Sequence, residues 1–187
     1  MRIISGSAKG RKIKTPDGLD TRPTSDRVKE SVFNIILRYV FDANVLDLFG
    51  GTGNLGLEAL SRGANQCIFV EQNKKAYNTL RENISDLGFG EKAVTYNKDS
   101  FSILNQLAIE GKSFNLIFLD PPYGKGYVEK SIEEIDKLNL LEEDGLIVSE
   151  YDNVDNVSEK IGNFEVYRTE KYGRVRISFW RKEIGNE

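Results

Sequence analysis

Short apolar runs alternate with amphipathic segments along most of the chain. Five such runs cover residues 45–49, 67–70, 93–96, 116–119 and 146–148. Amphipathic segments of about 10 to 15 residues, the usual length of a crossover helix, begin at Asn54, Asn73, Ser100 and Tyr127. This alternation predicts right-handed βαβ units, which place parallel strands in one sheet and helices on both of its faces.

Two segments outside this alternation predict a helix near the start of the fold and a hairpin at its end. Pro23 and the residues Thr24-Ser25-Asp26 supply the chemistry with which helices begin. Apolar residues then recur at the spacing of a helix of about four turns: Val28, Val32, Phe33, Ile35, Ile36 and Tyr39. Two β-rich segments at 164–167 and 175–180, joined through Tyr172-Gly173, predict a closing antiparallel hairpin.

The length of 187 residues suits one domain built around one core. We therefore expect residues 1–187 to form a single domain, with a core over residues 25–182 and a short basic extension over residues 1–24. No apolar run approaches the roughly 20 residues of a membrane span, and no signal-peptide core follows the polar, basic N-terminus. The expected location is the cytoplasm.

The chain contains no histidine and one cysteine. The absence of imidazole excludes Ser-His and Cys-His nucleophile pairs, histidine-ligated zinc and a histidine general base. Any chemistry must therefore use carboxylates, backbone groups or a cofactor, and we expect no metal. Cys67 stands in an apolar run, so we expect it to be a small buried side chain.

The formal net charge of -3 averages over unlike segments. Residues 1–38 carry 9 basic and 4 acidic side chains, residues 39–164 carry 11 and 21, and residues 165–182 carry 6 and 2. Because a polyanion responds to local charge, an acidic body with basic ends is compatible with nucleic acid bound at the ends. The alternative is that these basic residues are only solvated. Nucleic-acid binding is better supported over residues 1–14, which hold five basic residues and no acidic one: Arg2, Lys9, Arg11, Lys12 and Lys14.

A glycine-rich segment follows the first predicted strand. It runs from Asp47 to Gly56, and Gly51, Gly53 and Gly56 satisfy the G-x-G-x-x-G pattern of dinucleotide sites. A dinucleotide would bring a pyrophosphate to this turn, yet Asp47 precedes the glycines and no Lys or Arg occurs between residues 47 and 61. S-adenosylmethionine carries a sulfonium and an ammonium and no phosphate, so it fits this acidic turn better.

Carboxylates follow three successive predicted strands. Asp47, Glu71 and Asp99 stand at these strand ends, and in an open α/β sheet the ligand lies beyond the carboxyl ends of the strands. Glu71 can accept hydrogen bonds from ribose hydroxyls and Asp99 from an adenine amino group, so the three acids together favour S-adenosylmethionine. Taken singly, each acid could instead cap a helix or shape a turn.

The fourth predicted strand ends in Asp120-Pro121-Pro122-Tyr123, the most specific motif of the chain. Two successive prolines fix two φ angles and remove two N–H donors, which leaves the Asp120 carboxylate and carbonyl oxygens as a rigid row of acceptors. Such a row fits an exocyclic amino group, and Tyr123 offers a face on which a planar base stacks. The alternative is a proline-rich turn after a buried strand.

Taken together, these motifs resemble those of the class I amino-methyltransferases. Three longer stretches are similar to one bacterial family within that class, the small-subunit (16S) ribosomal RNA guanine-N2 methyltransferases: RIISG (2–6), RPTSDRVKESVFN (22–34) and LGLEALSRGA (55–64). The resemblance covers nearly the whole chain. Because the DPPY motif also occurs in DNA adenine and protein glutamine enzymes, the expected substrate rests mainly on residues 22–34.

The resemblance implies a Rossmann-like class I methyltransferase fold. Its sheet would be mostly parallel and seven-stranded, with helices on both faces, a C-terminal antiparallel hairpin and a short basic N-terminal extension. Asp47, Gly51 and Gly53 would hold the methionine end of the cofactor, Glu71 the ribose and Asp99 the adenine. Asp120, Pro121, Pro122 and Tyr123 would hold the guanine amino group, and Arg22 and Thr24 would lie beside the cofactor or the target base. RNA phosphates would be bound by the basic residues of the extension: Arg2, Lys9, Arg11, Lys12 and Lys14.

The expected function is therefore S-adenosylmethionine-dependent methylation of a guanine N2 amine in 16S rRNA during small-subunit assembly. The expected substrate is a partly assembled 30S particle, and the expected enzyme is a monomer. Two alternatives stay open: a DNA adenine-N6 methyltransferase with the same acceptor row, and a nonenzymatic RNA-binding assembly factor that keeps the cofactor fold. The lack of a target-recognition domain in the sequence disfavours the DNA enzyme, and methyl transfer itself would exclude the assembly factor.

Overall fold

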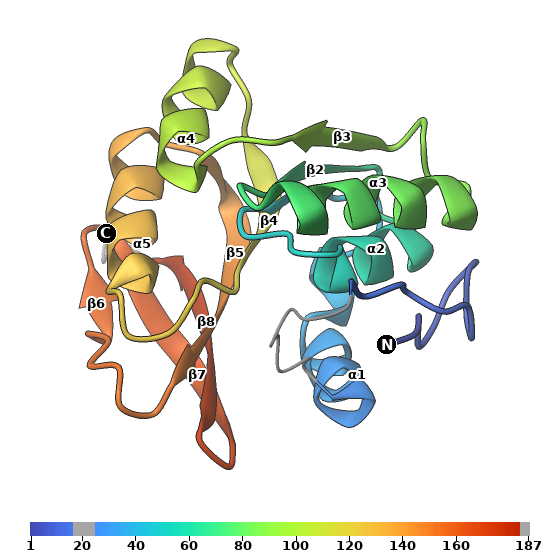
Figure 1. Ribbon diagram of the computed structural model, residues 1–187. Helices are drawn as coiled ribbons and strands as arrows, with labels where there is room; N and C mark the ends of the chain where they lie inside the picture. Colours follow the sequence, from blue (N-terminus) through green and yellow to red (C-terminus); the bar gives the residue numbers. More distant parts are fainter. Residues whose placement is uncertain (17–24, 184–187) are drawn as a thin grey trace.

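The computed structural model describes residues 1–16 and 25–183. The described strands form one sheet in the order β3-β2-β1-β4-β5-β8-β7-β6 (Figure 1). Strands β1 to β5 pair in parallel, and β5, β8, β7 and β6 pair in antiparallel fashion. The strands are β1 (Asn44–Asp47), β2 (Gln66–Val70), β3 (Ala93–Tyr96), β4 (Phe114–Leu119), β5 (Leu141–Asp152), β6 (Lys160–Ile161), β7 (Phe164–Tyr172) and β8 (Val175–Lys182).

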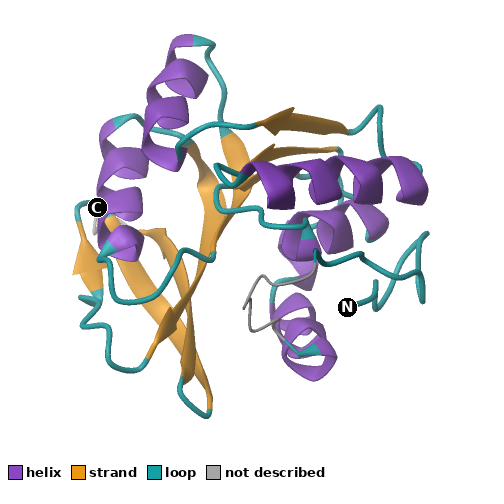
Figure 2. Cartoon of the chain, viewed as in Figure 1, coloured by secondary structure: helices purple, strands orange, loops and turns teal. Residues whose placement is uncertain are grey.

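The helices of the described residues flank the sheet in two groups (Figures 1 and 2). The first group is α1 (Asp26–Ile35), the short 3₁₀ helix η1 (Leu37–Tyr39), α2 (Asn54–Ser61) and α3 (Lys74–Leu87). The second is α4 (Ser100–Ile109) and α5 (Tyr127–Lys137). The observed architecture is the expected α/β fold with a parallel core and an antiparallel C-terminal hairpin.

Successive strand residues face two separate hydrophobic cores, as the period of a β-strand requires. Val45, on β1, packs into the core covered by α1, α2 and α3. Its neighbour Leu46 packs into the core covered by α4 and α5. Phe118 and Ile117 repeat this division on β4. The central strands are therefore buried on both faces, which explains why they read as continuous apolar runs.

The predicted helix starts are confirmed. Helices α2, α4 and α5 begin at Asn54, Ser100 and Tyr127, and Asn73 caps α3 by accepting a hydrogen bond from the Ala76 backbone N–H at 3.0 Å. These positions were predictable because the pattern changes there from strand to helix periodicity. Side chains cap α3 and α4, whereas glycines without a side-chain cap precede α2 and α5.

Several boundaries differ from the prediction. The sheet has an eighth strand, β6, which is too short to leave a periodic pattern. Strand β7 extends to Tyr172, beyond the predicted 164–167, because residues such as Arg168 and Thr169 are exposed and give no apolar alternation. Strand β5 begins at Leu141, before the predicted run at 146–148. The first helix ends at Ile35 and continues as the 3₁₀ helix instead of completing four α-helical turns.

Residues 1–13 fold back against the helices instead of extending into solvent. Ile3, Ala8 and Ile13 are buried in the core that α1, α2 and α3 cover. Gly6 has a φ of 86°, and a Cβ atom there would lie 1.8 Å from the carbonyl oxygen of Ser61. Only glycine allows this close passage over the end of α2. The prediction of one domain over residues 1–187 stays a prediction, because residues 17–24 and 184–187 lie outside the described residues.

The buried carboxylate of Glu58, on α2, anchors this N-terminal segment. It accepts hydrogen bonds from the backbone N–H groups of Ile4 (2.8 Å) and Ser5 (3.1 Å). It also pairs with Lys29 Nζ at 3.3 Å and Arg62 Nε at 2.7 Å. Lys29 is fully buried, and burial lowers its pKa although the Glu58 charge opposes that shift. One acid on α2 thus joins α1, α2 and the N-terminal segment.

No helix within residues 1–16 and 25–183 is long and apolar enough to cross a membrane.

Cys67 is fully buried on β2, and burial raises the pKa of its thiol well above the usual value. The prediction that Cys67 serves as a small buried side chain is confirmed.

Replacing the anchoring acid by its amide, Glu58→Gln, is expected to destabilise the fold by about 3 to 5 kcal/mol, because the Lys29 ammonium would be left buried without its counter-charge. Urea unfolding followed by circular dichroism measures this change. Glu134→Gln is the matched control, since Glu134 forms an i,i+3 pair with the largely exposed Lys137. That control should cost less than about 1 kcal/mol. Equal losses in the two variants would contradict the anchoring role of Glu58.

Candidate active site

The strand order brings the predicted acids to one edge of the sheet. Strands β3, β2, β1, β4 and β5 are parallel neighbours, so their carboxyl ends lie side by side. Asp47 ends β1, Glu71 follows β2, Asp99 follows β3 and Asp120 follows β4. This is the edge at which open α/β sheets bind their ligands.

The glycine turn after β1 is closed by backbone hydrogen bonds. Gly50 N–H donates to the Val70 carbonyl (2.8 Å), and Gly53 N–H donates to the Gly50 carbonyl (2.7 Å). Gly53 has a φ of 95°, and a Cβ atom there would lie 2.6 Å from a methyl carbon of Leu57. The turn therefore needs glycine at residue 53. Gly51, in the middle of the turn, donates its N–H to the Glu71 carboxylate at 2.9 Å.

Asp47 is a buried acid, with 2% of its surface exposed. Its carboxylate accepts a hydrogen bond from the Gly56 backbone N–H at 3.0 Å. Burial raises the pKa of Asp47 to about 7, the Gly56 hydrogen bond opposes this shift, and the Glu71 charge adds to it. No lysine or arginine pairs with Asp47 among the described residues. A positively charged ligand would favour the ionised carboxylate, so the site fits a cation.

Glu71 and Asp99 both make local hydrogen bonds. Glu71 accepts from the Gly51 and Asn73 backbone N–H groups, and the side chain of Asn97 donates to the Glu71 carbonyl at 2.7 Å. Asp99 is exposed and caps α4, accepting through Oδ1 from the N–H groups of residues 101 and 102. The capping alternative is thus the role that the structure gives Asp99, and its Oδ2 atom carries no hydrogen bond from the described residues. Binding of ribose and adenine by these two acids stays a prediction.

Asp120 lies half-buried beyond the end of β4 and has no hydrogen-bond partner within residues 1–16 and 25–183. Burial raises the pKa of this carboxyl well above its usual value, and the charges of Glu150 and Asp47 add to the shift. Pro121 is buried, whereas Pro122 and Tyr123 are exposed. Within the described part of the chain, the segment therefore combines an acid that has no hydrogen-bond partner with an accessible ring. Binding of an amino group by this segment stays a prediction.

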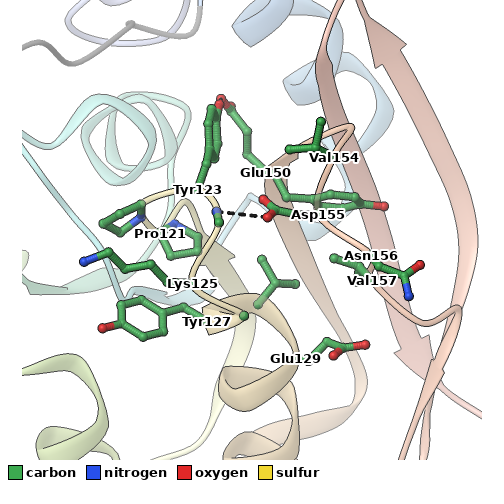
Figure 3. A pocket seen from close by; sticks show the side chains of 15 residues that line it. Pro121, Tyr123, Lys125, Tyr127, Glu129, Glu150, Val154, Asp155, Asn156 and Val157 are labelled. Carbon is green, nitrogen blue, oxygen red and sulfur yellow. Dashed lines mark hydrogen bonds between the residues drawn. The ribbon is translucent and has the colours of Figure 1, made fainter.

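A cavity of about 300 Å³ lies beside this segment (Figure 3). It is lined by Pro121, Tyr123, Tyr127, Glu150 and Val154, among others. The cavity thus presents apolar and aromatic walls with a few carboxylates, a composition typical of sites for planar ligands.

Glu150 is a site residue that the sequence reasoning missed. It lies on β5, is 6% exposed, and accepts a hydrogen bond from the Tyr123 hydroxyl at 2.8 Å. The signal was present, because Glu150 follows the apolar run at 146–148, as Glu71 and Asp120 follow the runs at 67–70 and 116–119.

An aromatic cluster joins the turn after β1 to the first turns of α4 and α5. The rings of Phe49 and Tyr127 stack with centroids 6.2 Å apart, and Phe101 packs edge-on against Tyr127 at 5.3 Å. Lys130 Nζ lies 4.0 Å from the Phe101 ring centroid. The turn after β1 and the N-terminal ends of α4 and α5 are therefore held together by these side-chain contacts.

Three of the five predicted RNA-binding residues have partners within the protein. Arg2 pairs with Asp26 at 2.7 Å, Lys14 pairs with Asp86 at 2.8 Å and with Glu82 at 3.5 Å, and Arg11 donates to the Asp86 carbonyl.

The other two, Lys9 and Lys12, are exposed and form no ion pair with any described residue. Lys12 also lines an open hollow of about 590 Å³ with Arg2 and Lys14. Arg22 and Thr24 lie outside the described residues. Within residues 1–16 and 25–183, no group of three or more metal-ligating side chains could hold a metal ion.

Known proteins match this chain along most of its length. The family model described as "Conserved hypothetical protein 95" matches residues 1–181. The Escherichia coli (strain K12) protein named "Ribosomal RNA small subunit methyltransferase D" is 34% identical over 187 residues, which cover 100% of this chain and 92% of that protein. The Haemophilus influenzae protein of the same name is 38% identical over 151 residues, which cover 80% of this chain and 78% of that protein.

A solved structure agrees with these matches. The one described as "Putative methyltransferase yhhF from Escherichia coli" superposes with a TM-score of 0.86 at 36% identity, over 98% of both chains. Sequence and structure therefore give the same relationship, and the Rossmann-like class I methyltransferase fold is confirmed. The chain belongs to the conserved hypothetical protein 95 family.

Proposed function

We propose that this protein transfers a methyl group from S-adenosylmethionine to the exocyclic N2 amine of a guanine in 16S ribosomal RNA during small-subunit assembly. The observation behind the proposal is the Asp120 carboxyl, which has no hydrogen-bond partner among the described residues and precedes Pro121, Pro122 and Tyr123 at the wall of a cavity. The names of the relatives support the general reaction in this proposal, which is methylation of ribosomal RNA. The choice of guanine N2 rests on the family resemblance and on the acceptor row.

The residues of the sheet edge fit S-adenosylmethionine. Asp47 is a buried acid without a cationic partner in the described residues, as a site for a sulfonium and an ammonium requires. The absence of any Lys or Arg between residues 47 and 61 disfavours a phosphate-bearing ligand at the glycine turn. When bound, S-adenosylmethionine would supply an activated methyl group, so the protein has mainly to orient the target amine.

Asp120 orients that amine for transfer. The carboxylate and the neighbouring proline carbonyls accept both amine hydrogens, which keeps electron density on the nitrogen. Tyr123, 37% exposed, offers a ring face on which the base stacks. Because burial raises the pKa of Asp120, this carboxylate is a better proton acceptor than an ordinary aspartate. The proton leaves to Asp120 or to water.

Within the proposal, Lys9 and Lys12 contact the RNA backbone. Both are exposed and lack ion pairs with described residues, so binding a phosphate breaks no ion pair inside the described protein. Arg2, Arg11 and Lys14 also add positive potential, but each already holds an acid or a carbonyl. The five basic residues thus divide into two that are available to bind phosphate and three that also support the segment.

The proposal further places the reaction in the cytoplasm, on a partly assembled 30S particle, with the enzyme acting as a monomer. A particle can present the target guanine in a loop, which avoids the cost of extruding a paired base. The proposed chemistry requires no metal, because the methyl group is already activated by its sulfonium.

Asp120→Asn is expected to reduce methyl transfer by at least about 100-fold, because the amide carries no negative charge and cannot take up the proton of the amine. Affinity for S-adenosylmethionine should stay nearly unchanged. Transfer of tritium from labelled cofactor to naked rRNA, small subunits and duplex DNA measures the rates. Asp144→Asn, at an exposed residue of β5, is the matched control.

The same assay tests the function itself. Label in rRNA or in small subunits supports the proposal, and label in DNA alone refutes the substrate. Cofactor and RNA binding without any label would instead support the assembly factor. Unchanged turnover in Asp120→Asn would refute the role of Asp120.

Affinity for S-adenosylmethionine is expected to rise with pH between about 5.5 and 7.5, by up to about tenfold per unit. The reason is that a cation favours ionised Asp47, whose pKa lies at about 7 in the free protein, so that below this pH binding must first displace a proton. Isothermal titration calorimetry measures the slope. Asp47→Asn should bind more weakly and with a flatter slope, and identical slopes in both proteins would contradict this account.

Lys9→Ala with Lys12→Ala is expected to weaken RNA binding and to reduce the slope of log affinity against log salt by about 0.7 to 0.9 for each phosphate that the variant no longer binds. Filter binding of a small-subunit rRNA fragment over a range of potassium chloride concentrations measures both. Lys112→Ala with Lys137→Ala is the charge-matched control. A double variant with the wild-type slope would remove Lys9 and Lys12 from the interface.

A further inference from the structure

Glu150 occupies the strand end next to Asp120. In the parallel register of β4 and β5, Leu119 pairs with Ser149, so the chain reaches Asp120 and Glu150 at the same level of the sheet. Glu150 is 6% exposed. A carboxylate so deeply buried is costly unless hydrogen bonds support it, so its presence needs a reason.

The hydroxyl of Tyr123 donates a hydrogen bond to Glu150 Oε1 at 2.8 Å. Figure 3 shows Glu150 reaching toward the hydroxyl end of the Tyr123 side chain, at one wall of the cavity. Burial and the neighbouring charge and hydrogen bond of Glu150 raise the pKa of the Tyr123 hydroxyl, so it stays protonated and donates. The ring is therefore held at its far end while 37% of the residue stays exposed.

The backbone around Tyr123 does not fix the ring by itself. Gly124 and Gly126 follow it, both at positive φ, in a loop whose neighbouring residues are largely exposed. The Gly124 N–H donates to the Asp155 carboxylate at 2.9 Å, which ties the loop to residues after β5 (Figure 3). That bond holds the backbone, whereas the bond to Glu150 sets the direction of the ring.

We propose that Glu150 is a positioning residue for methyl transfer, which acts by holding the Tyr123 hydroxyl and so fixing the ring face against which the target base stacks. This inference rests on the proposed function. It assigns no proton transfer to Glu150. The hydrogen bond from Tyr123 to Glu150 places a rigid ring face beside Asp120, so the base and its amine acceptor keep one relative geometry.

The carboxylate of Glu150 has a second, electrostatic effect that provides an independent readout. Among the described residues, Glu150 on β5, Asp47 on β1 and Tyr123 in the loop after β4 interact electrostatically with Asp120. The Glu150 charge adds to burial in raising the Asp120 pKa. Removing this charge while keeping an acceptor should therefore lower that pKa and move the acidic limb of the pH–rate profile to lower pH.

A double-mutant cycle tests whether Glu150 acts through its hydrogen bond with Tyr123. Glu150→Ala and Tyr123→Phe should each lower kcat by about tenfold, as expected when a hydrogen bond to a charged group is removed, with the KM for S-adenosylmethionine unchanged. If Glu150 acts through Tyr123, the double variant should be no slower than the slower single variant. Losses that multiply to about 100-fold would show independent roles and overturn the proposal.

Glu150→Gln provides the rescue, because the amide oxygen still accepts from Tyr123. It should recover most of the rate that Glu150→Ala loses and shift the acidic limb to lower pH. No recovery, or an unshifted limb, would overturn the proposal. Glu143→Ala, at the exposed opposite end of β5 and paired with Lys182, should leave rate and profile unchanged, and thermal melts confirm folding of each variant.

These outcomes separate the two proposals. A wild-type protein that labels no ribosomal RNA would refute the proposed function before any variant is compared. A wild-type protein that does label it, with Glu150→Ala equally fast, would refute the positioning role and leave the proposed function standing.

Discussion

Negative charge concentrated at the carboxyl edge of the sheet is the constraint on which the rest of the site depends. The parallel order of β1 to β5 brings Asp47, Asp120 and Glu150 to this edge, and no lysine or arginine pairs with Asp47 or Asp120 among the described residues. Buried carboxylates tend to keep their protons, as the raised pKa values of Asp47 and Asp120 reflect. A cationic cofactor favours the ionised form of these carboxylates. The acidic body of the protein is therefore consistent with the proposed chemistry.

The basic N-terminal segment is joined to the acidic body by a separate buried network. Glu58 holds the backbone of Ile4 and Ser5 and the ammonium of Lys29, so the segment keeps a fixed place relative to α1 and α2. Removing one partner of such a network leaves a charge uncompensated. Lys9 and Lys12, which are proposed to bind RNA, therefore belong to a folded surface rather than to an extended N-terminal arm.

The sequence was sufficient to predict the layered fold and the starts of four helices, because the periodicity changes from strand to helix at each of these starts. It could not give β6 or the length of β7, since short or exposed strands carry no apolar pattern. The burial of Lys29 could not be predicted either, because it depends on Glu58, which is distant in sequence. At the site, strand ends located Asp47 and Asp120, whereas the partner of Tyr123 required knowledge of which strands are neighbours.

In the proposed reaction, the segment Asp120-Pro121-Pro122-Tyr123 presents an exocyclic guanine amine for methylation. This can be tested by mass spectrometric nucleoside analysis of small-subunit RNA, from particles lacking this modification, after reaction with the protein and S-adenosylmethionine. We expect N2-methylguanosine as the newly formed methylated nucleoside. Methylation of a ring nitrogen of guanine, or formation of N6-methyladenosine in place of N2-methylguanosine, would contradict it.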